Sequence, residues 1–353
     1  MSAHLLLSSI DATTKANTVS NYKQTDYKYL YIILTTMIRA ACILVIASSI
    51  SQIQIAAAFS ASPSSTSSVQ ALLSGNQEQI QSLKNVAKSI IADGDDDESV
   101  VPTNDVFYLR YLLETSYEND AERIEALKRN LEWRKSDGKH IVMSAHDAIK
   151  AARSDENSKK WNNKPVEQAA PHSDRIGKYL TSVQCITTSL PSSNDLVYIV
   201  RAGKIDDKAL MSSVSVDEMI EFFLYVKEVN AAMADIRSVE TDSLIKVITC
   251  NDLSGVKLVG GSSDFRSALS LSSKKAVELY PALSGRSLLL NLPSLLGALV
   301  KIFTPLFPDA VRKRIRFEKC EPLKNVDNLM QVVESGAVRD EFIEQIDMLS
   351  YGE

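Results

Sequence analysis

The spacing of apolar residues predicts a helical segment in the middle of the chain. Apolar positions recur at helical spacing in two runs that end at Gly138, so residues 104–138 are expected to form a helical hairpin. A shorter helix is expected over Gln77 to Ile91. Between the two, the acidic run from Asp93 to Glu98 is typical of a solvated linker and indicates a domain boundary.

The second half of the chain alternates short apolar strands with helices. Ser215 and Glu218 form a capping box before a long helix, and a second helix ends at Tyr280-Pro281. Continuously apolar strands indicate a sheet covered on both faces, and helical crossovers between them indicate parallel pairs. The strands are expected at Leu196 to Val200, Leu244 to Cys250 and Ser287 to Leu292. The predicted fold class is α/β, with an N-terminal helical lobe and an α/β lobe that contains a mixed, largely parallel sheet.

An unusually apolar segment follows the third strand. Ser294 to Phe303 carries only one charge, Lys301, and is bounded by prolines. A helix that is apolar all round is either buried core or a cover over an apolar cavity or lipid. Behind it lies a basic cluster, which is either ordinary surface charge or a contact for a membrane surface. The cluster comprises Arg312, Lys313, Arg314, Arg316 and Lys319.

The first hundred residues differ from the rest. Residues 30–50 are apolar but broken by Arg39, and they are long enough to span a bilayer. Alternatively, Met37 starts a signal peptide whose small residues permit cleavage before Phe59, and a Ser-rich stretch follows.

The junction Ala56-Ala57-Ala58-Phe59 resembles the two-part presequence of algae with secondary plastids. We therefore expect residues 1–58 to be a signal and targeting segment and residues 59–100 to be a Ser-rich transit stretch with an acidic linker. The predicted location is the plastid, with the mature protein starting near Phe59. The alternatives are the secretory pathway alone, or a membrane anchor retained through residues 30–50.

Composition narrows the class of protein. The chain has 353 residues, 45% apolar and 24% charged, with a net charge of −5, which excludes a fully disordered chain and gives no basic field for nucleic acid. Four separated cysteines and four scattered histidines lack metal-ligand spacing, so no disulfide framework and no metal are expected. The cysteines in apolar runs are expected to be reduced and buried.

No constellation of catalytic residues is found. The motifs GxSxG, GxGxxG and GxxxxGK[ST] are all missing from the sequence, so the chain is not expected to be an enzyme and needs no catalytic cofactor. Asp252 is the carboxylate that could suggest catalysis, but its expected role is to organise the turn before Gly255.

Six motifs in order resemble the CRAL-TRIO family of lipid-binding proteins. The most specific are Asp252-Leu253-Ser254-Gly255 after the central strand, and Tyr280-Pro281 followed by Leu290-Asn291-Leu292-Pro293. The others are the helix Asp105 to Leu112, the helix ending in Trp133-Arg134, the strand and turn Val197 to Lys204, and Lys313 to Phe317. The resemblance covers residues 100–335 and implies a helical lobe at 101–150 and a lipid-binding domain at 151–345.

The resemblance implies a pocket and not an active site. The sheet would floor an apolar cavity that holds one hydrophobic lipid or isoprenoid-like ligand. The pocket residues expected from the strands are Tyr198, Val200, Val247, Thr249, Leu288 and Leu290. The segment from Ser294 would be the lid helix, covering the cavity with Leu295, Leu296, Leu299, Ile302 and Phe303.

The implied function is binding and transfer of the ligand between membranes by lid opening and closing. The protein would be a monomer that contacts membranes peripherally, with Arg312, Lys313, Arg314 and Arg316 as the basic patch at the membrane surface. The alternative is a non-transferring module that senses lipid or recruits a protein.

Two departures from the family concern inositol lipids. Thr304 stands where phosphatidylinositol-transfer members carry a lysine, and Leu271 stands where they carry a paired glutamate. These departures weaken the resemblance to the members that bind inositol phosphate, and they leave open whether this chain binds an inositol lipid.

Overall fold

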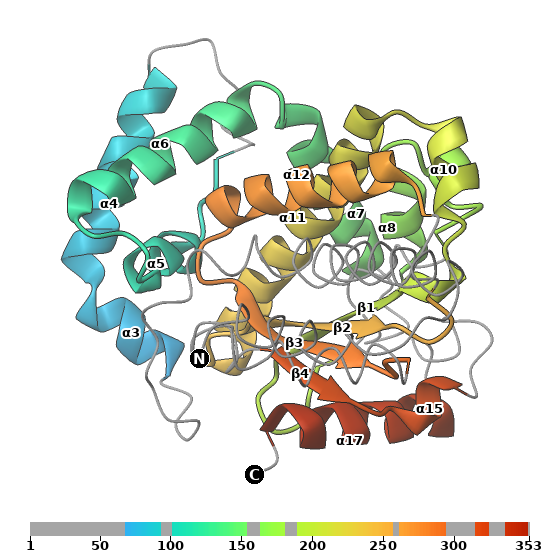
Figure 1. Ribbon diagram of the computed structural model, residues 1–353. Helices are drawn as coiled ribbons and strands as arrows, with labels where there is room; N and C mark the ends of the chain where they lie inside the picture. Colours follow the sequence, from blue (N-terminus) through green and yellow to red (C-terminus); the bar gives the residue numbers. More distant parts are fainter. Residues whose placement is uncertain are drawn as a thin grey trace, which may run out of the picture.

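The computed structural model describes residues 68–92, 101–153, 163–180, 189–256, 261–293, 315–324 and 336–351. The protein combines a parallel sheet with three groups of helices (Figure 1). One group lies on one face of the sheet, a second lies on the opposite face, and the third forms a lobe beside them.

The sheet has the order β1-β2-β3-β4, and each neighbouring pair is parallel. Its strands are β1 (Leu196–Arg201), β2 (Val247–Asp252), β3 (Ser284–Leu290) and β4 (Ile315–Glu318). The predicted α/β class and the parallel pairing are confirmed. The observed β2 starts three residues later than expected and β3 starts three residues earlier, because short apolar runs mark a strand without fixing its ends.

Helices α11 (Val216–Thr241) and α12 (Ser263–Leu279) are the crossovers from β1 to β2 and from β2 to β3. The predicted capping box starts α11: the Ser215 side chain accepts a hydrogen bond from the Glu218 amide, and Glu218 in turn accepts one from the Ser215 amide. With α7 (Lys139–Arg153), α8 (Lys164–Ala169), α9 (Ser173–Ile176) and α10 (Asp207–Ser213), these crossovers form the helical layer above the sheet in Figure 1. Helices α15 (Glu321–Lys324) and α17 (Ala337–Tyr351) lie on the opposite side.

The N-terminal lobe contains four helices of the described chain. They are α3 (Val69–Gly75), α4 (Gln77–Ala92), α5 (Asp105–Leu113) and α6 (Asp120–Lys135). The predicted hairpin corresponds to α5 and α6, and the expected short helix corresponds to α4.

The boundary of this lobe differs from the one expected at residue 101. Ile80, Leu83 and Ala87 are buried in one apolar cluster with α5 and α6, Leu72 and Leu73 of α3 pack against it, and Val69 is buried as well. Residues 69–92 therefore belong to the folded lobe rather than to a transit stretch and linker. The apolar face of α4 supplies this packing. The prediction of a transit stretch and linker rested instead on the serine and acidic residues between positions 59 and 100.

Within the described residues, no helix is both long and apolar enough to cross a membrane. The apolar stretch at residues 30–50 and the junction at Phe59 lie outside the described residues.

Candidate functional site

The two faces of the sheet pack against different helices. On the face that we call the inner face, Leu196, Tyr198 and Val247 share an apolar cluster with α11 and α12. On the outer face, the intervening residues Val197 and Ile248 share a cluster with α17. Side chains alternate between faces along a strand, and directly paired residues of parallel strands share a face, so the strand register assigns every position.

The six predicted pocket residues divide between these faces. Tyr198, Val200, Val247 and Thr249 lie on the inner face. Leu288 and Leu290 lie on the outer face, fully buried in the cluster that contains Phe342 and Ile346 of α17.

The inner-face residues of β3 are instead Ser287 and Leu289, which pair with Thr249 and Asn251. The six residues predicted for one pocket therefore do not share one face of the sheet, because a shift of one residue moves every side chain to the other face. A continuously apolar strand gives no alternation from which its inner side can be recognised.

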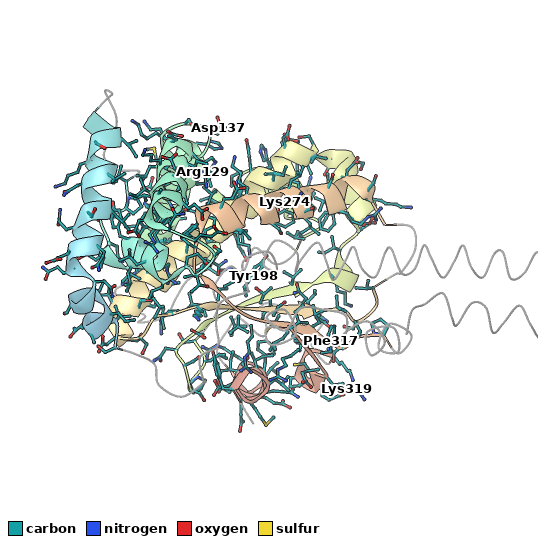
Figure 2. All side chains as sticks on the ribbon, turned by 60° about the vertical axis from the view of Figure 1, so that its left-hand side comes forward. Arg129, Asp137, Tyr198, Lys274, Phe317 and Lys319 are labelled. Atoms are coloured by element: carbon teal, nitrogen blue, oxygen red, sulfur yellow. The ribbon has the colours of Figure 1, made fainter. Side chains whose placement is uncertain are left out.

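The inner face carries a second apolar cluster at the carboxyl ends of the strands. Leu253, Leu289 and Ile315 are its buried members. Ala202, Val256, Leu292 and Phe317 pack against them and stay half-buried. Figure 2 labels Tyr198 in the layer between the helices and the sheet, and Phe317 on the edge strand β4. An apolar floor with half-exposed members is suited to binding an apolar ligand.

Aromatic rings from the two crossover helices belong to the first apolar cluster of the inner face. The rings of Phe223 on α11 and Phe265 on α12 lie 6.1 Å apart in an edge-to-face arrangement. The Lys227 ammonium group of α11 lies 5.8 Å from the centre of the Tyr198 ring, which is a cation–π contact. The wall is thus apolar with one half-buried cation.

One polar atom of the inner face has no partner in the described structure. The side-chain amide nitrogen of Asn251, at the carboxyl end of β2, is buried and makes no hydrogen bond. Leaving a buried donor unpaired costs about 1–3 kcal/mol. The sequence-based analysis missed Asn251, although its place beside Asp252 could have drawn attention to it.

Asp252 has the structural role expected of it. Its carboxylate is 1% exposed and accepts hydrogen bonds from the Ser254 hydroxyl at 2.6 Å and from the Asn291 amide at 3.1 Å. The Arg201 guanidinium pairs with it at 3.3 Å. All of its partners are protein groups of the outer face and the adjoining turn, so Asp252 is a tie between strand ends.

The turn after β1 depends on glycine. A Cβ atom at Gly203 would clash with the carbonyl oxygen of Ser254, and Gly255 adopts a φ of +76°. The Ala202-Gly203-Lys204 turn and the Asp252-to-Gly255 turn therefore pack backbone against backbone, which shapes the carboxyl edge of the sheet.

The expected lid residues Leu295, Leu296, Leu299, Ile302 and Phe303 lie outside the described residues, as do Thr304, Arg312, Lys313 and Arg314. Of the predicted basic patch, Arg316 is described: it is exposed on the edge strand β4 and pairs in register with Leu288, which places it on the outer face. Leu271 is 47% exposed on α12.

Two buried arginines connect the lobes. Arg110 of α5 bonds to Asp235 of α11 at 2.6 Å, and Arg134 of α6 bonds to Glu228 of α11 at 2.9 and 2.8 Å. The sequence pattern predicted the hairpin but not this role of its arginines. A charged residue inside an otherwise buried apolar helix face was the available signal.

The described residues provide no grouping of His, Cys, Asp and Glu that could hold a metal ion. Cys250 and Cys320 are free and buried, as expected for structural thiols. Burial raises the pKa of Cys320 to about 11 and that of Cys250 well above its ordinary value, so both stay protonated at neutral pH.

Comparison with models of known protein families identifies the domain that contains the sheet. Residues 186–339 match the model of the CRAL/TRIO domain. The chain is also similar to the crystal structure of Sfh5, at 13% sequence identity and a TM-score of 0.43, over 70% of this chain and 80% of that one. A search of curated proteins found no match.

The matched segment contains all four strands and both crossover helices. The α/β lobe is therefore a CRAL/TRIO domain, the type of domain that defines a family of lipid-binding proteins.

Proposed function

We propose that the protein binds one hydrophobic lipid or isoprenoid-like ligand on the inner face of the sheet and transfers it between membranes. The observation that carries the proposal is the half-exposed apolar cluster at the carboxyl ends of the strands, within a domain of a lipid-binding family. Removing apolar surface from water contributes about 25 cal/mol per Å², so an aliphatic or isoprenoid body is the ligand that this floor favours.

The polar end of the ligand would face Asn251. Its unpaired amide nitrogen is a hydrogen-bond donor, so the ligand should carry an acceptor such as an ester, quinone or carboxylate oxygen. The polar end would then lie at the carboxyl edge of β2, and the apolar body would lie along Leu289 and Phe317.

The first experiment is extraction of lipid from the purified full chain, followed by mass spectrometry. We expect one lipid species per chain. Thr249→Trp should reduce the bound lipid because the new side chain fills the floor, whereas Leu271→Trp introduces the same side chain at an exposed position of α12 and should not. Equal lipid content in both variants, or none in the unaltered protein, would count against the proposal.

Transfer by lid opening rests on the sequence of the segment between β3 and β4. Leu296 and Leu299 would cover the ligand, and Arg312, Arg314 and their basic neighbours would dock on an anionic membrane. Leu296→Asp together with Leu299→Asp should abolish lipid exchange between vesicles while the thermal melting curve stays cooperative. Reversing the charges of Arg312 and Arg314 should weaken docking, most strongly at low salt. Bound lipid without exchange would favour the alternative, a lipid-sensing or recruiting module.

We also retain plastid targeting, with a mature terminus near Phe59, as a proposal. The packing of α3 sets a limit on it: Ser68 and Val69 belong to the fold, so processing would have to end before Ser68. N-terminal sequencing of the protein from its native cell tests this, and an intact Met1 or Met37 terminus would exclude it.

A further inference from the structure

A cavity of about 480 Å³ lies at the junction of the two lobes. Its walls come from α5, α6, α7 and α11, together with the segment 101–104 and the residues that follow α12. None of the six sheet positions predicted for the pocket lines it. The lining stripe of α11 runs through Ala231, Ala232 and Asp235, whereas Lys227 of the same helix contacts Tyr198 of the sheet. The cavity is therefore separate from the inner-face site.

The floor of this cavity contains charged side chains, and each of these charges is paired with an opposite charge of the protein. It contains the Arg110–Asp235 and Arg134–Glu228 ion pairs, whose side chains are at most 12% exposed. Arg134 also donates to the Asn130 side-chain oxygen at 2.7 Å, and Arg110 donates to the Ile245 carbonyl at 2.8 Å. These charges are satisfied by protein groups, so the floor does not require a charged ligand beside it.

The body of the cavity is apolar. Phe107 of α5, Ile149 of α7, Ile236 of α11 and Leu283 before β3 line it. These side chains come from both lobes, so a molecule that fills the space would contact both. The volume lies within the range of roughly 300–1,000 Å³ that is usual for small-molecule sites.

The α7 side of the cavity is basic. His146, Lys150 and Arg153 line it at positions i, i+4 and i+7 of α7. His146 lies 3.3 Å from Glu228, and Arg153 pairs with Glu240 at 2.6 Å. Lys150 is exposed and makes no ion pair with any residue that the structure describes.

Lys150 carries the remaining positive charge of the lining. Of the four Lys and Arg side chains that line the cavity, Arg110, Arg134 and Arg153 pair with carboxylates, and Lys150 has no ion pair among the described residues. An apolar chamber with a cationic group at one side is complementary to an amphiphile whose head is an anion.

We propose that the lobe junction is a second binding site, which takes an aliphatic carboxylate of medium chain length. The carboxylate would pair with Lys150, and the aliphatic chain would lie against Phe107, Ile149 and Ile236. Because the ligand would contact both lobes, its binding would stabilise their association.

The test uses the purified full chain, titrated with decanoate in a calorimeter and in thermal melting. Decanol and decyltrimethylammonium are the neutral and cationic analogues. We expect decanoate to bind and to raise the melting temperature, and the cationic analogue to do neither. Lys150→Glu should weaken decanoate binding about tenfold, because an attractive charge becomes a repulsive one. Lys274→Glu makes the same charge reversal at an exposed position of α12 and should leave decanoate binding unchanged.

Two further variants locate the bound molecule. Ala232→Phe fills the cavity and should abolish decanoate binding, whereas Thr249→Trp fills the inner-face floor and should not affect it. The proposal is overturned if decanoate does not bind, or if decanol or the cationic analogue binds as tightly as decanoate does. It is also overturned if Lys150→Glu and Lys274→Glu have the same effect on decanoate binding. Loss of binding in Thr249→Trp would also overturn it, because decanoate would then occupy the inner-face site. Since Lys150 is exposed, its substitution keeps the test valid even if Ala232→Phe fails to fold.

Discussion

The guanidinium group of Arg134 on α6 donates two hydrogen bonds to the carboxylate of Glu228 on α11, at 2.9 and 2.8 Å, and both side chains are at most 3% exposed. This bidentate pair joins a helix of the N-terminal lobe to the longest helix of the CRAL/TRIO domain. The pair ties the two lobes together. Because both charges are removed from water, its desolvation penalty and the attraction between its charges are both large.

Replacing one member of this pair should destabilise the protein strongly. Glu228→Gln leaves the Arg134 charge buried without its counter-ion, and we expect a loss of about 3–5 kcal/mol in the free energy of unfolding, measured with urea. The double change Arg134→Met with Glu228→Leu removes both charges and should cost less than Glu228→Gln. If the double variant were the less stable of the two, the pair would be contributing net stability beyond charge compensation.

The same pair gives the protein a defined acid sensitivity. Burial raises the pKa of Glu228, but Arg134 and His146 lower it more, to about 2 from an ordinary value of 4.5. Since the folded-state pKa is depressed, this carboxylate contributes its full stability above pH 4.5 and loses it as the pH falls towards 2. The contribution is on the order of 3 kcal/mol.

Urea unfolding measured at several pH values between 7 and 2.5 would reveal this loss. Glu228→Gln cannot lose the contribution, so its stability should fall less over the range from pH 4.5 to 2.5. Parallel curves for the two proteins would show that other carboxylates cause the acid response.

Gly203 offers a test of the packed turns at the carboxyl edge of the sheet. Gly203→Ala places a methyl group against the Ser254 carbonyl, a backbone atom that cannot move aside easily, and should cost about 2 kcal/mol. Gly75→Ala is the matched control: its Cβ would meet nothing within 4 Å, and it replaces glycine at the end of a helix. Thermal melting should show a lower midpoint for the first variant and an unchanged or higher midpoint for the second.

The start of the folded chain can be located by truncation. The Ser68 hydroxyl donates to Asp242 at 2.9 Å, the Gln70 amide donates to the same carboxylate at 2.8 Å, and Val69 is 1% exposed. A chain starting at Ser68 should keep these contacts, whereas a chain starting at Gln77 loses α3 and should melt at a lower temperature. Equal melting temperatures would show that α3 adds nothing to the fold.

The sequence by itself determined the class of the fold and most of its elements. Continuous apolar runs separated by amphipathic helices require a sheet covered on both faces, and the observed parallel order follows from the crossovers. The capping box at Ser215 and the turn role of Asp252 were also predictable, because both depend on contacts within a few residues.

Only the tertiary structure decided which side of each strand faces the helices. Leu288 and Leu289 are both leucines and both almost fully buried, and they lie on opposite faces because side chains alternate along a strand. The register with β2 decides that Leu289 is the one on the inner face. Composition and periodicity do not contain that information when a strand is apolar throughout. The missing hydrogen-bond partner of the Asn251 side-chain amide is likewise a property of the folded chain and not of its sequence.

The contacts at the lobe junction likewise depend on the tertiary structure. Arg110 and Asp235 are 125 positions apart in the chain, and Arg134 and Glu228 are 94 apart, so no local pattern pairs them. The α4 helix was predicted from its spacing, but its membership of the N-terminal lobe depends on contacts with α5 and α6 that form only in the folded chain. Local propensity selects the elements, whereas the pairing of buried charges and of strand faces depends on which elements meet.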